Sequence, residues 1–159
     1  MISEQASTQR IERKESLATT MWMIEDREEM AYVIRLMIEV SFPGITVKEF
    51  RDGESAVKAL QSGGVPMPSM VTVDGDLGRN KQTGPQIIEA LGKELNAKKA
   101  TTYFVAMSGV DELNDEMFRV AQDIGQPVQV VGKGPEANTK LLALLEEIEK
   151  GGESKKSEE

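Results

Sequence analysis

Residues 70–74 read Met-Val-Thr-Val-Asp, so four residues suited to a buried strand run directly into a carboxylate. Three further segments share this pattern of an apolar run followed by polar side chains: Thr20–Ile24 before Glu25 and Asp26, Tyr103–Met107 before Ser108, and Val128–Gly132 before Lys133. Short apolar runs separated by amphipathic stretches are typical of parallel strands in βαβ units. Ligand chemistry in open sheets of this kind gathers at the carboxyl ends of the strands. We therefore expect these polar side chains to share one rim.

The segments between the runs predict helices, so the expected fold class is α/β with five strands and five helices. A further strand is predicted at Ile45–Phe50, where apolar and polar residues alternate as they do at a partly exposed sheet edge. The first, third and fourth strands are the most continuously apolar, which places them at the centre of a sheet covered on both faces. The first helix follows Asp26, and its predicted buried face consists of Met30, Val33, Ile34, Met37 and Ile38.

The chain divides into one domain and two tails. Residues 1–18 are polar and predict a mobile N-terminal tail, and residues 19–150 form the domain. Residues 151–159 form a charged C-terminal tail, after a helix that is expected to end at Gly151. A long polar loop is predicted at Gly75–Thr83, and Gly84-Pro85 opens the next helix because proline is well tolerated in a first turn.

Composition excludes several classes of function. The 159-residue chain contains no cysteine and no histidine, which rules out thiol catalysis, imidazole catalysis and metal sites that use histidine. The net charge of −8 argues against direct binding to nucleic acid, whose partners usually carry a basic surface. No apolar run approaches the ~20 residues of a membrane-spanning helix, and the polar N-terminus does not read as a secretory signal. No membrane insertion is therefore expected, and the predicted location is cytoplasmic.

The acidic side chains at the predicted rim would need positive charge among them. Two carboxylates ~5 Å apart repel by roughly 3 kcal/mol at an effective dielectric constant near ~20, so Glu25, Asp26 and Asp74 require a counter-charge. Hard oxygen ligands select Mg²⁺ or Mn²⁺, and Lys133 supplies a second positive centre. With these charges in place, Asp74 can attack a phosphoryl group in line, and Ser108 can donate a hydrogen bond to the group once it is acquired.

In this order and placement, the residues resemble the receiver domain of two-component response regulators, over about residues 19–150 of the chain. The matching positions follow the family's order of acidic pair, phosphoacceptor aspartate, switch hydroxyl and strand-five lysine: Glu25 and Asp26, Asp74, Ser108, and Lys133. Gly84 resembles the glycine that closes the family's loop after the phosphoacceptor. The resemblance implies a flavodoxin-like, doubly wound parallel sheet in the strand order 2-1-3-4-5. It also implies Mg²⁺ held by Asp26, Asp74 and the backbone carbonyl of Asp76, with Glu25 acting through water.

The resemblance implies a role in a two-component phosphorelay. A histidine kinase or a histidine phosphotransfer protein would donate a phosphoryl group to Asp74, and a downstream protein target would respond to the phosphoprotein by docking. Apart from Mg²⁺-dependent self-phosphorylation and autodephosphorylation at Asp74, no enzymatic activity is expected. Because no output domain follows residue 150, we expect a stand-alone receiver of the single-domain type.

Two positions depart from the family's pattern. The family's lysine is usually followed directly by a proline in a cis bond, whereas this chain has Lys133-Gly134-Pro135. An aromatic residue often lies three positions before the lysine, where this chain has Val130. Because valine is too small to relay a switch by ring rotation, the response to phosphorylation is expected near the phosphate, in Gly75–Thr83 and Gly109–Asn114.

Three other functions stay open on the sequence alone. Asp74-Gly75-Asp76 also fits the Asp-x-Asp loop of haloacid-dehalogenase-like phosphohydrolases, although those enzymes place their nucleophile after the first strand. A glutamate followed by Asp-x-Asp also resembles Toprim nuclease and primase domains, against which the acidic balance of the chain argues. The third is a pseudo-receiver, a receiver fold that no longer cycles phosphate and serves as a binding module. The four matching positions argue against this last alternative, and the altered turn after Lys133 keeps it open.

Overall fold

The computed structural model describes residues 20–75 and 82–158, and these residues build a five-stranded parallel sheet. The strands are β1 (Thr20–Ile24), β2 (Thr46–Phe50), β3 (Met70–Val73), β4 (Tyr103–Ala106) and β5 (Val128–Val130). Their order is β2-β1-β3-β4-β5, and every neighbouring pair runs parallel. The predicted flavodoxin-like order is therefore confirmed, with the most continuously apolar strands at the centre. The predicted N-terminal tail, residues 1–18, lies outside the described residues.

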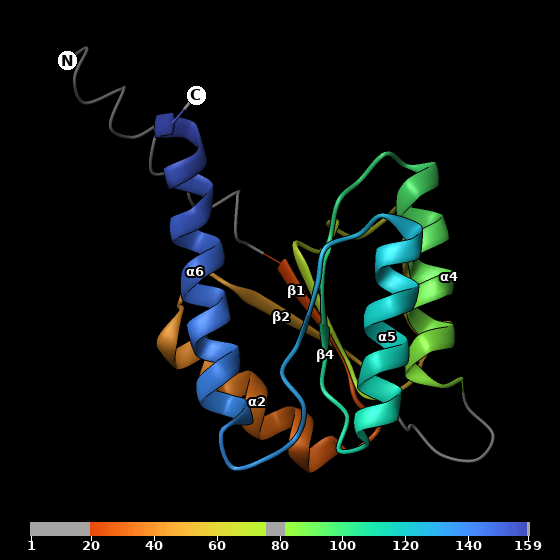
Figure 1. The fold of residues 1–159 in the computed structure, drawn as a ribbon, viewed down its shortest axis with the longest axis horizontal. Helices are drawn as coiled ribbons and strands as arrows, with labels where there is room; N and C mark the ends of the chain where they lie inside the picture. The colour runs from red at the N-terminus through yellow and green to blue at the C-terminus, as the bar shows by residue number, and fades with distance from the viewer. Residues whose placement is uncertain (1–19, 76–81, 159) are drawn as a thin grey trace.

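Five helices of the described chain cover the two faces of this sheet. They are α2 (Glu28–Ser41), α3 (Gly53–Ser62), α4 (Gly84–Ala97), α5 (Asp111–Ile124) and α6 (Ala137–Glu158). The buried residues of α2 and α6 pack in one apolar cluster, and those of α3, α4 and α5 pack in another. Figure 1 shows the resulting three layers, with α2 and α6 on one side of the sheet and α4 and α5 on the other.

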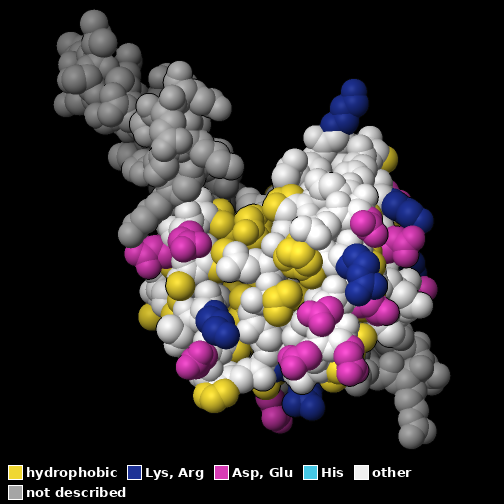
Figure 2. Space-filling view, viewed as in Figure 1, with side chains coloured by type: hydrophobic (Ala, Val, Ile, Leu, Met, Phe, Trp, Pro, Cys, Tyr) yellow, Lys and Arg dark blue, Asp and Glu magenta, His cyan; other side chains and the backbone are white. Residues whose placement is uncertain are grey.

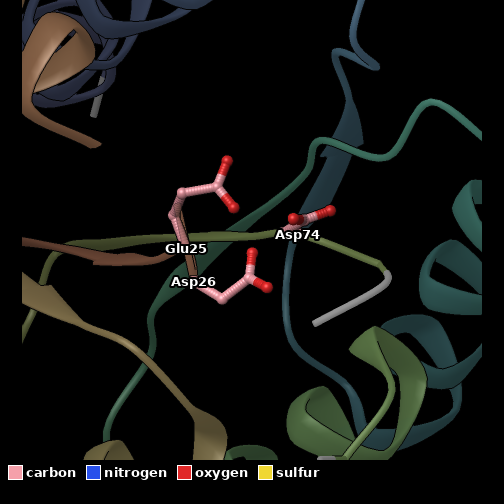
Figure 3. Close-up of side chains that lie close together, drawn as sticks. All are labelled: Glu25, Asp26 and Asp74. Carbon is pink, nitrogen blue, oxygen red and sulfur yellow. The ribbon is translucent and has the colours of Figure 1, made fainter. Parts of the chain in front are cut away.

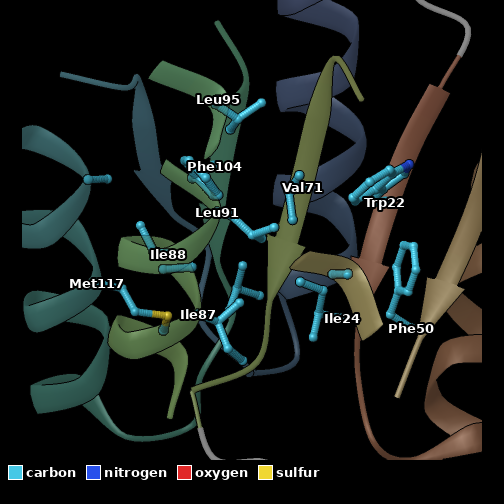
Figure 4. Packing of buried hydrophobic residues seen from close by; sticks show 14 of the residues in the cluster. Trp22, Ile24, Phe50, Val71, Ile87, Ile88, Leu91, Leu95, Phe104 and Met117 are labelled. Carbon is cyan, nitrogen blue, oxygen red and sulfur yellow. The ribbon is translucent and has the colours of Figure 1, made fainter. Parts of the chain in front are cut away.

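The side chains of β1 alternate between the two apolar clusters. Trp22 and Ile24 pack in the cluster under α3, α4 and α5, while Met21 and Met23 pack in the cluster under α2 and α6. Trp22 is fully buried, and its ring centroid lies 4.8 Å from that of Phe50 (Figure 4). Among the described residues, no atom accepts a hydrogen bond from its indole nitrogen. A one-residue slip in the register of β1 would move each of these side chains into the other cluster, where it does not fit, and the residues that follow β1 are therefore fixed in place.

Helix ends follow from local sequence signals. Thr83 caps α4: its hydroxyl accepts a hydrogen bond from the Gln86 N–H, and the Gln86 side chain accepts one from the Thr83 N–H. Gly63 and Gly125 end α3 and α5 in the left-handed conformation, with φ of 69° and 87°. Glycine takes this conformation without the steric cost that a Cβ would add.

Two predictions about helices are wrong. The α6 helix continues past Gly151 to Glu158, because glycine in a helix costs only about 1 kcal/mol relative to alanine and ends a helix reliably only in a left-handed cap. Val33 is 54% exposed rather than buried, whereas the rest of the predicted face is confirmed: Ile34 and Ile38 are buried, and Met30 and Met37 pack against the same cluster. The outer face of α2 is itself partly apolar, so periodicity alone could not exclude Val33 from the buried face. Strands β4 and β5 also end slightly earlier than predicted, at Ala106 and Val130.

Some apolar side chains reach the surface. On the side seen in Figure 2, they gather between the α6 side and the α5 side of the molecule. The exposed large apolar residues of the described chain include Phe118 of α5 and Val130 of β5. Within residues 20–75 and 82–158, none of the helices combines the length and the apolarity that a bilayer crossing requires.

Candidate functional site

Three carboxylates meet where β1 and β3 end. Glu25 and Asp26 directly follow β1, and Asp74 directly follows β3. Each offers one carboxylate oxygen to a group whose members all lie within 4.8 Å of one another (Figure 3). The backbone fixes this arrangement, because hydrogen bonds between strands continue past the strand ends. The Glu25 N–H donates to the Phe50 carbonyl at 3.0 Å, and the Asp74 N–H donates to the Ile24 carbonyl at 3.1 Å.

Lys133 lies against two of these carboxylates. Its Nζ is 3.0 Å from Asp74 Oδ2 and 3.4 Å from Glu25 Oε1. It follows Gly132, which has a left-handed φ of 75° and donates its N–H to the Ala106 carbonyl at 3.0 Å. The described peptide bonds are all trans, so the turn Lys133-Gly134-Pro135 contains no cis bond. The lysine amine therefore reaches the acidic cluster without the cis-proline turn that the family resemblance implies.

The surroundings of Glu25 favour its neutral form. The residue is only 4% exposed. Burial, followed by the hydrogen bond and the negative charge of Asp74, raises the pKa of Glu25 from 4.5 to about 7, although Lys133 partly offsets this. Among the described residues, no donor reaches Glu25 Oε2, which is buried. Leaving a buried acceptor without a partner costs about 1–3 kcal/mol, so a cation or donor at this oxygen would stabilise the site.

Ser108 packs directly on the residue that follows Asp74. Ser108 is 2% exposed, and a Cβ placed on Gly75 would lie only 2.7 Å from Ser108 Oγ. This Oγ accepts a hydrogen bond from the Val110 N–H at 3.0 Å. A hydroxyl that accepts one hydrogen bond keeps its own proton to donate in another. The fourth predicted strand end therefore brings its hydroxyl next to the Asp74 segment.

Gly84 closes the loop that follows Asp74. Its N–H donates to the Gly75 carbonyl at 3.0 Å. A Cβ placed on Gly84 would lie 2.8 Å from Gly75 Cα and 3.1 Å from the Asp74 carbonyl oxygen, so this approach requires glycine. Residues 76–81 of the loop lie outside the described residues, and so does the metal ligand implied at the backbone carbonyl of Asp76.

We expect Gly75→Ala to destabilise the protein by about 1–3 kcal/mol, because the added Cβ would overlap Ser108 and approach Leu113 Cβ. Urea unfolding followed by far-ultraviolet circular dichroism measures the difference in free energy. Gly44→Ala serves as the control, since no heavy atom lies within 4 Å of a Cβ at that position. Equal losses in the two variants would contradict the tight packing of Ser108 on Gly75.

The donor atoms at the rim suit a small, hard divalent cation. They are carboxylate oxygens, the ligands that Mg²⁺ and Mn²⁺ take in proteins. Lys133 pairs with two of the three acids, Glu25 and Asp74, and Glu25 Oε2 has no partner in the described part of the chain. A cavity of about 290 Å³ borders Glu25, Asp74 and Lys133 and reaches Met23 and Met107 below them. The residues present therefore fit such a cation.

The sequence analysis missed one residue of this site, which forms hydrogen bonds to the backbone of Ser108. Asn114 of α5 is 4% exposed, and its side-chain amide bonds both backbone groups of Ser108. A lone asparagine within a helical pattern is most often a surface residue. The single available signal was its position in the first turn of the helix that follows Ser108, where polar side chains often bond to nearby backbone.

Comparisons with known proteins agree on the fold. No family model and no curated protein matches this chain. The phosphorylated cyanobacterial phytochrome response regulator RcpA matches with a TM-score of 0.60 and 15% identity, over 83% of this chain and 91% of that chain. The Mn²⁺-bound form of the response regulator Rcp1 matches with a TM-score of 0.59 and 13% identity, over 81% of this chain and 92% of that chain.

A third solved structure belongs to a family of redox sensors in the streptococci that evolved from two-component response regulators. It matches with a TM-score of 0.62 and 17% identity, over 89% of this chain and 55% of that chain. At these identities the likeness concerns the fold alone. The chain has the fold of response regulator receiver domains.

Proposed function

We propose that this protein is a phospho-accepting receiver that takes a phosphoryl group on Asp74. The observation that carries the proposal is the Asp74 carboxylate at the end of a central strand, with Lys133 Nζ 3.0 Å away. Glu25 and Asp26 complete an acidic cluster whose oxygens lie within 4.8 Å of one another. The receiver fold of the chain and the phosphorylated state of the similar RcpA structure support this function.

The transfer uses groups that already lie at the rim. An Asp74 oxygen attacks the phosphorus atom of the donor and forms a P–O bond. The P–N bond to a donor histidine breaks, and its electron pair leaves on the imidazole nitrogen. Lys133 then pairs with the phosphoryl oxygens, and the Ser108 hydroxyl donates a hydrogen bond to one of them. Because this chain contains no histidine, the phosphohistidine belongs to another protein.

In this proposal Asp26, Asp74 and the backbone carbonyl of Asp76 hold Mg²⁺ or Mn²⁺, with Glu25 acting through water. The bound cation supplies positive charge that neutralises the phosphoryl oxygens. The hard donor set and the unpartnered Glu25 oxygen support this assignment. Manganese in the similar Rcp1 structure is a further support.

The partners follow from the same chemistry. The donor is a histidine kinase or a histidine phosphotransfer protein, and the phosphorylated form signals by docking to a downstream protein target. We propose a cytoplasmic phosphoprotein of a two-component system that neither inserts into a membrane nor binds nucleic acid directly, in keeping with its net charge of −8. Its catalysis is limited to self-phosphorylation and autodephosphorylation at Asp74.

Acetyl phosphate with Mg²⁺ tests the proposal, because this small donor needs no kinase. Intact-mass spectrometry is expected to show one added phosphate, and hydroxylamine is expected to remove it, as it removes acyl phosphates. Chelation with EDTA should suppress the modification, because it removes the cation whose positive charge the phosphoryl oxygens require. Asp26→Ala should reduce the modification, because it removes a proposed ligand of that cation. Absence of modification from acetyl phosphate and from a histidine kinase of the same organism would overturn the proposal.

A second candidate function is that of a pseudo-receiver, which binds partners without phosphorylation. The valine at position 130 favours it, because no aromatic ring is present there to relay a switch. The redox sensors with the same fold support the idea that such a sheet can serve other signals. A haloacid-dehalogenase-like phosphohydrolase is less favoured, because the acids that complete the cluster precede Asp74 in the chain. The acetyl phosphate experiment separates the first two functions.

A further inference from the structure

Buried amide side chains hold both ends of β4. At its start, Gln126 is 5% exposed; its Oε1 accepts from the Thr102 N–H at 3.0 Å, and its Nε2 donates to the Ala100 carbonyl at 3.1 Å. Beyond its end, Asn114 is 4% exposed; its Oδ1 accepts from the Ser108 N–H at 2.9 Å, and its Nδ2 donates to the Ser108 carbonyl at 2.9 Å. The two amides make similar hydrogen bonds, but only Asn114 acts at the rim.

At Ser108, hydrogen bonds from the Asn114 side chain take the place of hydrogen bonds between strands. Between-strand hydrogen bonding continues as far as Met107, whose N–H donates to the Val73 carbonyl at 3.0 Å. The backbone groups of Ser108 are buried beyond this point and need partners, and the Asn114 amide supplies both. The first turn of α5 therefore sets the position of the Ser108 backbone.

The same amide lies beside the turn that carries Lys133. A Cβ placed on Gly132 would lie 3.8 Å from the Ser108 carbonyl oxygen and 3.9 Å from Asn114 Nδ2. On its other side, Ser108 packs on Gly75, the residue after Asp74. Asn114 thus fixes the segment that lies between the two chain segments carrying Asp74 and Lys133.

We infer that Asn114 is a positioning residue, which holds Ser108 so that its hydroxyl proton is aimed at a phosphoryl group on Asp74. The Ser108 Oγ already accepts from the Val110 N–H, so a fixed backbone restricts the directions in which the hydroxyl can donate. Asn114 does not touch the phosphoryl group itself and acts only through Ser108. This inference rests on the proposed phosphoryl acceptance at Asp74.

The alternative is that Asn114 is a structural clamp like Gln126, with no effect on ligand binding. Double-mutant cycles separate the two roles, because a residue that acts only through Ser108 loses its effect once the hydroxyl is removed. The probe is beryllofluoride with Mg²⁺, a mimic of the aspartyl phosphate, and its affinity is measured from amide chemical shifts. Urea unfolding of each variant gives the stability loss separately.

We expect Ser108→Ala to weaken beryllofluoride binding about tenfold, as for one hydrogen bond to a charged group. Asn114→Ala should weaken it by a similar factor in the wild-type background and by less than about twofold in the Ser108→Ala background. Mg²⁺ affinity without beryllofluoride should stay unchanged. Gln126→Ala should destabilise the protein about as much as Asn114→Ala and leave beryllofluoride affinity unchanged. If Asn114→Ala does not fold, the neutral Asn114→Ser takes its place, with weakening expected because the shorter side chain cannot bond both backbone groups of Ser108.

Each outcome has one meaning. Failure of the wild type to bind beryllofluoride overturns the proposed function and this inference with it. Normal binding by the wild type and by the Asn114 variants overturns the inference alone. Equal weakening by Asn114→Ala with and without the Ser108 hydroxyl, or weakening by Gln126→Ala, shows a purely structural effect and also overturns it.

Discussion

Asp74→Asn is expected to abolish phosphoryl acceptance from acetyl phosphate. The amide has nearly the same size as the carboxylate but lacks a nucleophilic oxygen, so the P–O bond cannot form. The substitution should not unfold the protein, because it also removes one of the negative charges that lie within 4.8 Å of each other. Intact-mass spectrometry should show one added phosphate on the wild type and none on this variant.

Asp111→Asn provides the comparison for this experiment. Asp111 is an exposed acid in the first turn of α5, outside the acidic cluster. Its variant has the same change in charge and should accept phosphate as the wild type does. Equal modification of the wild type and Asp74→Asn would place the reactive carboxylate elsewhere in the chain, and peptide mapping of the modified protein would then locate it.

Stability in the absence of metal is expected to fall as the pH rises from about 4.5 to about 7, and Glu25→Gln should remove most of this slope. The pKa of Glu25 is raised from 4.5 to about 7 in the folded protein, chiefly by burial and then by Asp74. Between these values the native state retains a proton that the unfolded state has released, so each increase in pH favours unfolding. The contribution is at most about 3 kcal/mol, fully present below pH 4.5 and lost as the pH passes about 7.

Urea unfolding at several pH values with EDTA present measures this slope for the wild type and Glu25→Gln. Glutamine stays neutral at every pH and therefore cannot contribute to the slope. Glu89→Gln is the control, because Glu89 forms only an exposed pair with Lys93 on α4. A wild-type slope that survives in Glu25→Gln would assign the pH dependence to other groups. Constant m-values across the series would show that the extent of unfolding is the same.

The fold could be predicted because the sequence repeats one simple pattern. Continuous apolar runs marked the central strands, and alternation at Ile45–Phe50 marked the edge strand β2. The three acids and Lys133 could be placed together for the same reason: each lies within three residues of the end of a parallel strand, and the carboxyl ends of such strands share an edge. Backbone topology alone was sufficient for both predictions.

The rest depends on tertiary contacts that leave no periodic signal. The exposure of Val33 could not be read from the sequence of α2, because Tyr32, Leu36 and Val40 place apolar side chains on its outer face as well. Asn114 looked like any polar helical residue until the backbone of Ser108 was seen to lack partners in the sheet. The length of α6 likewise depends on the conformation at Gly151, and residue identity does not determine it.

The burial of Trp22 makes tryptophan fluorescence a measure of unfolding in this protein. Trp22 is the single tryptophan of the chain, so all indole fluorescence comes from one site. The indole is fully buried against Phe50, and its N–H has no acceptor among the described residues. We therefore expect its emission maximum at short wavelength, and we expect quenchers dissolved in water not to reach the ring. Trp22 packs in the cluster under α3, α4 and α5, together with Ile24 and Phe50. The red shift of its emission therefore follows global unfolding, because the indole reaches water only when this cluster opens.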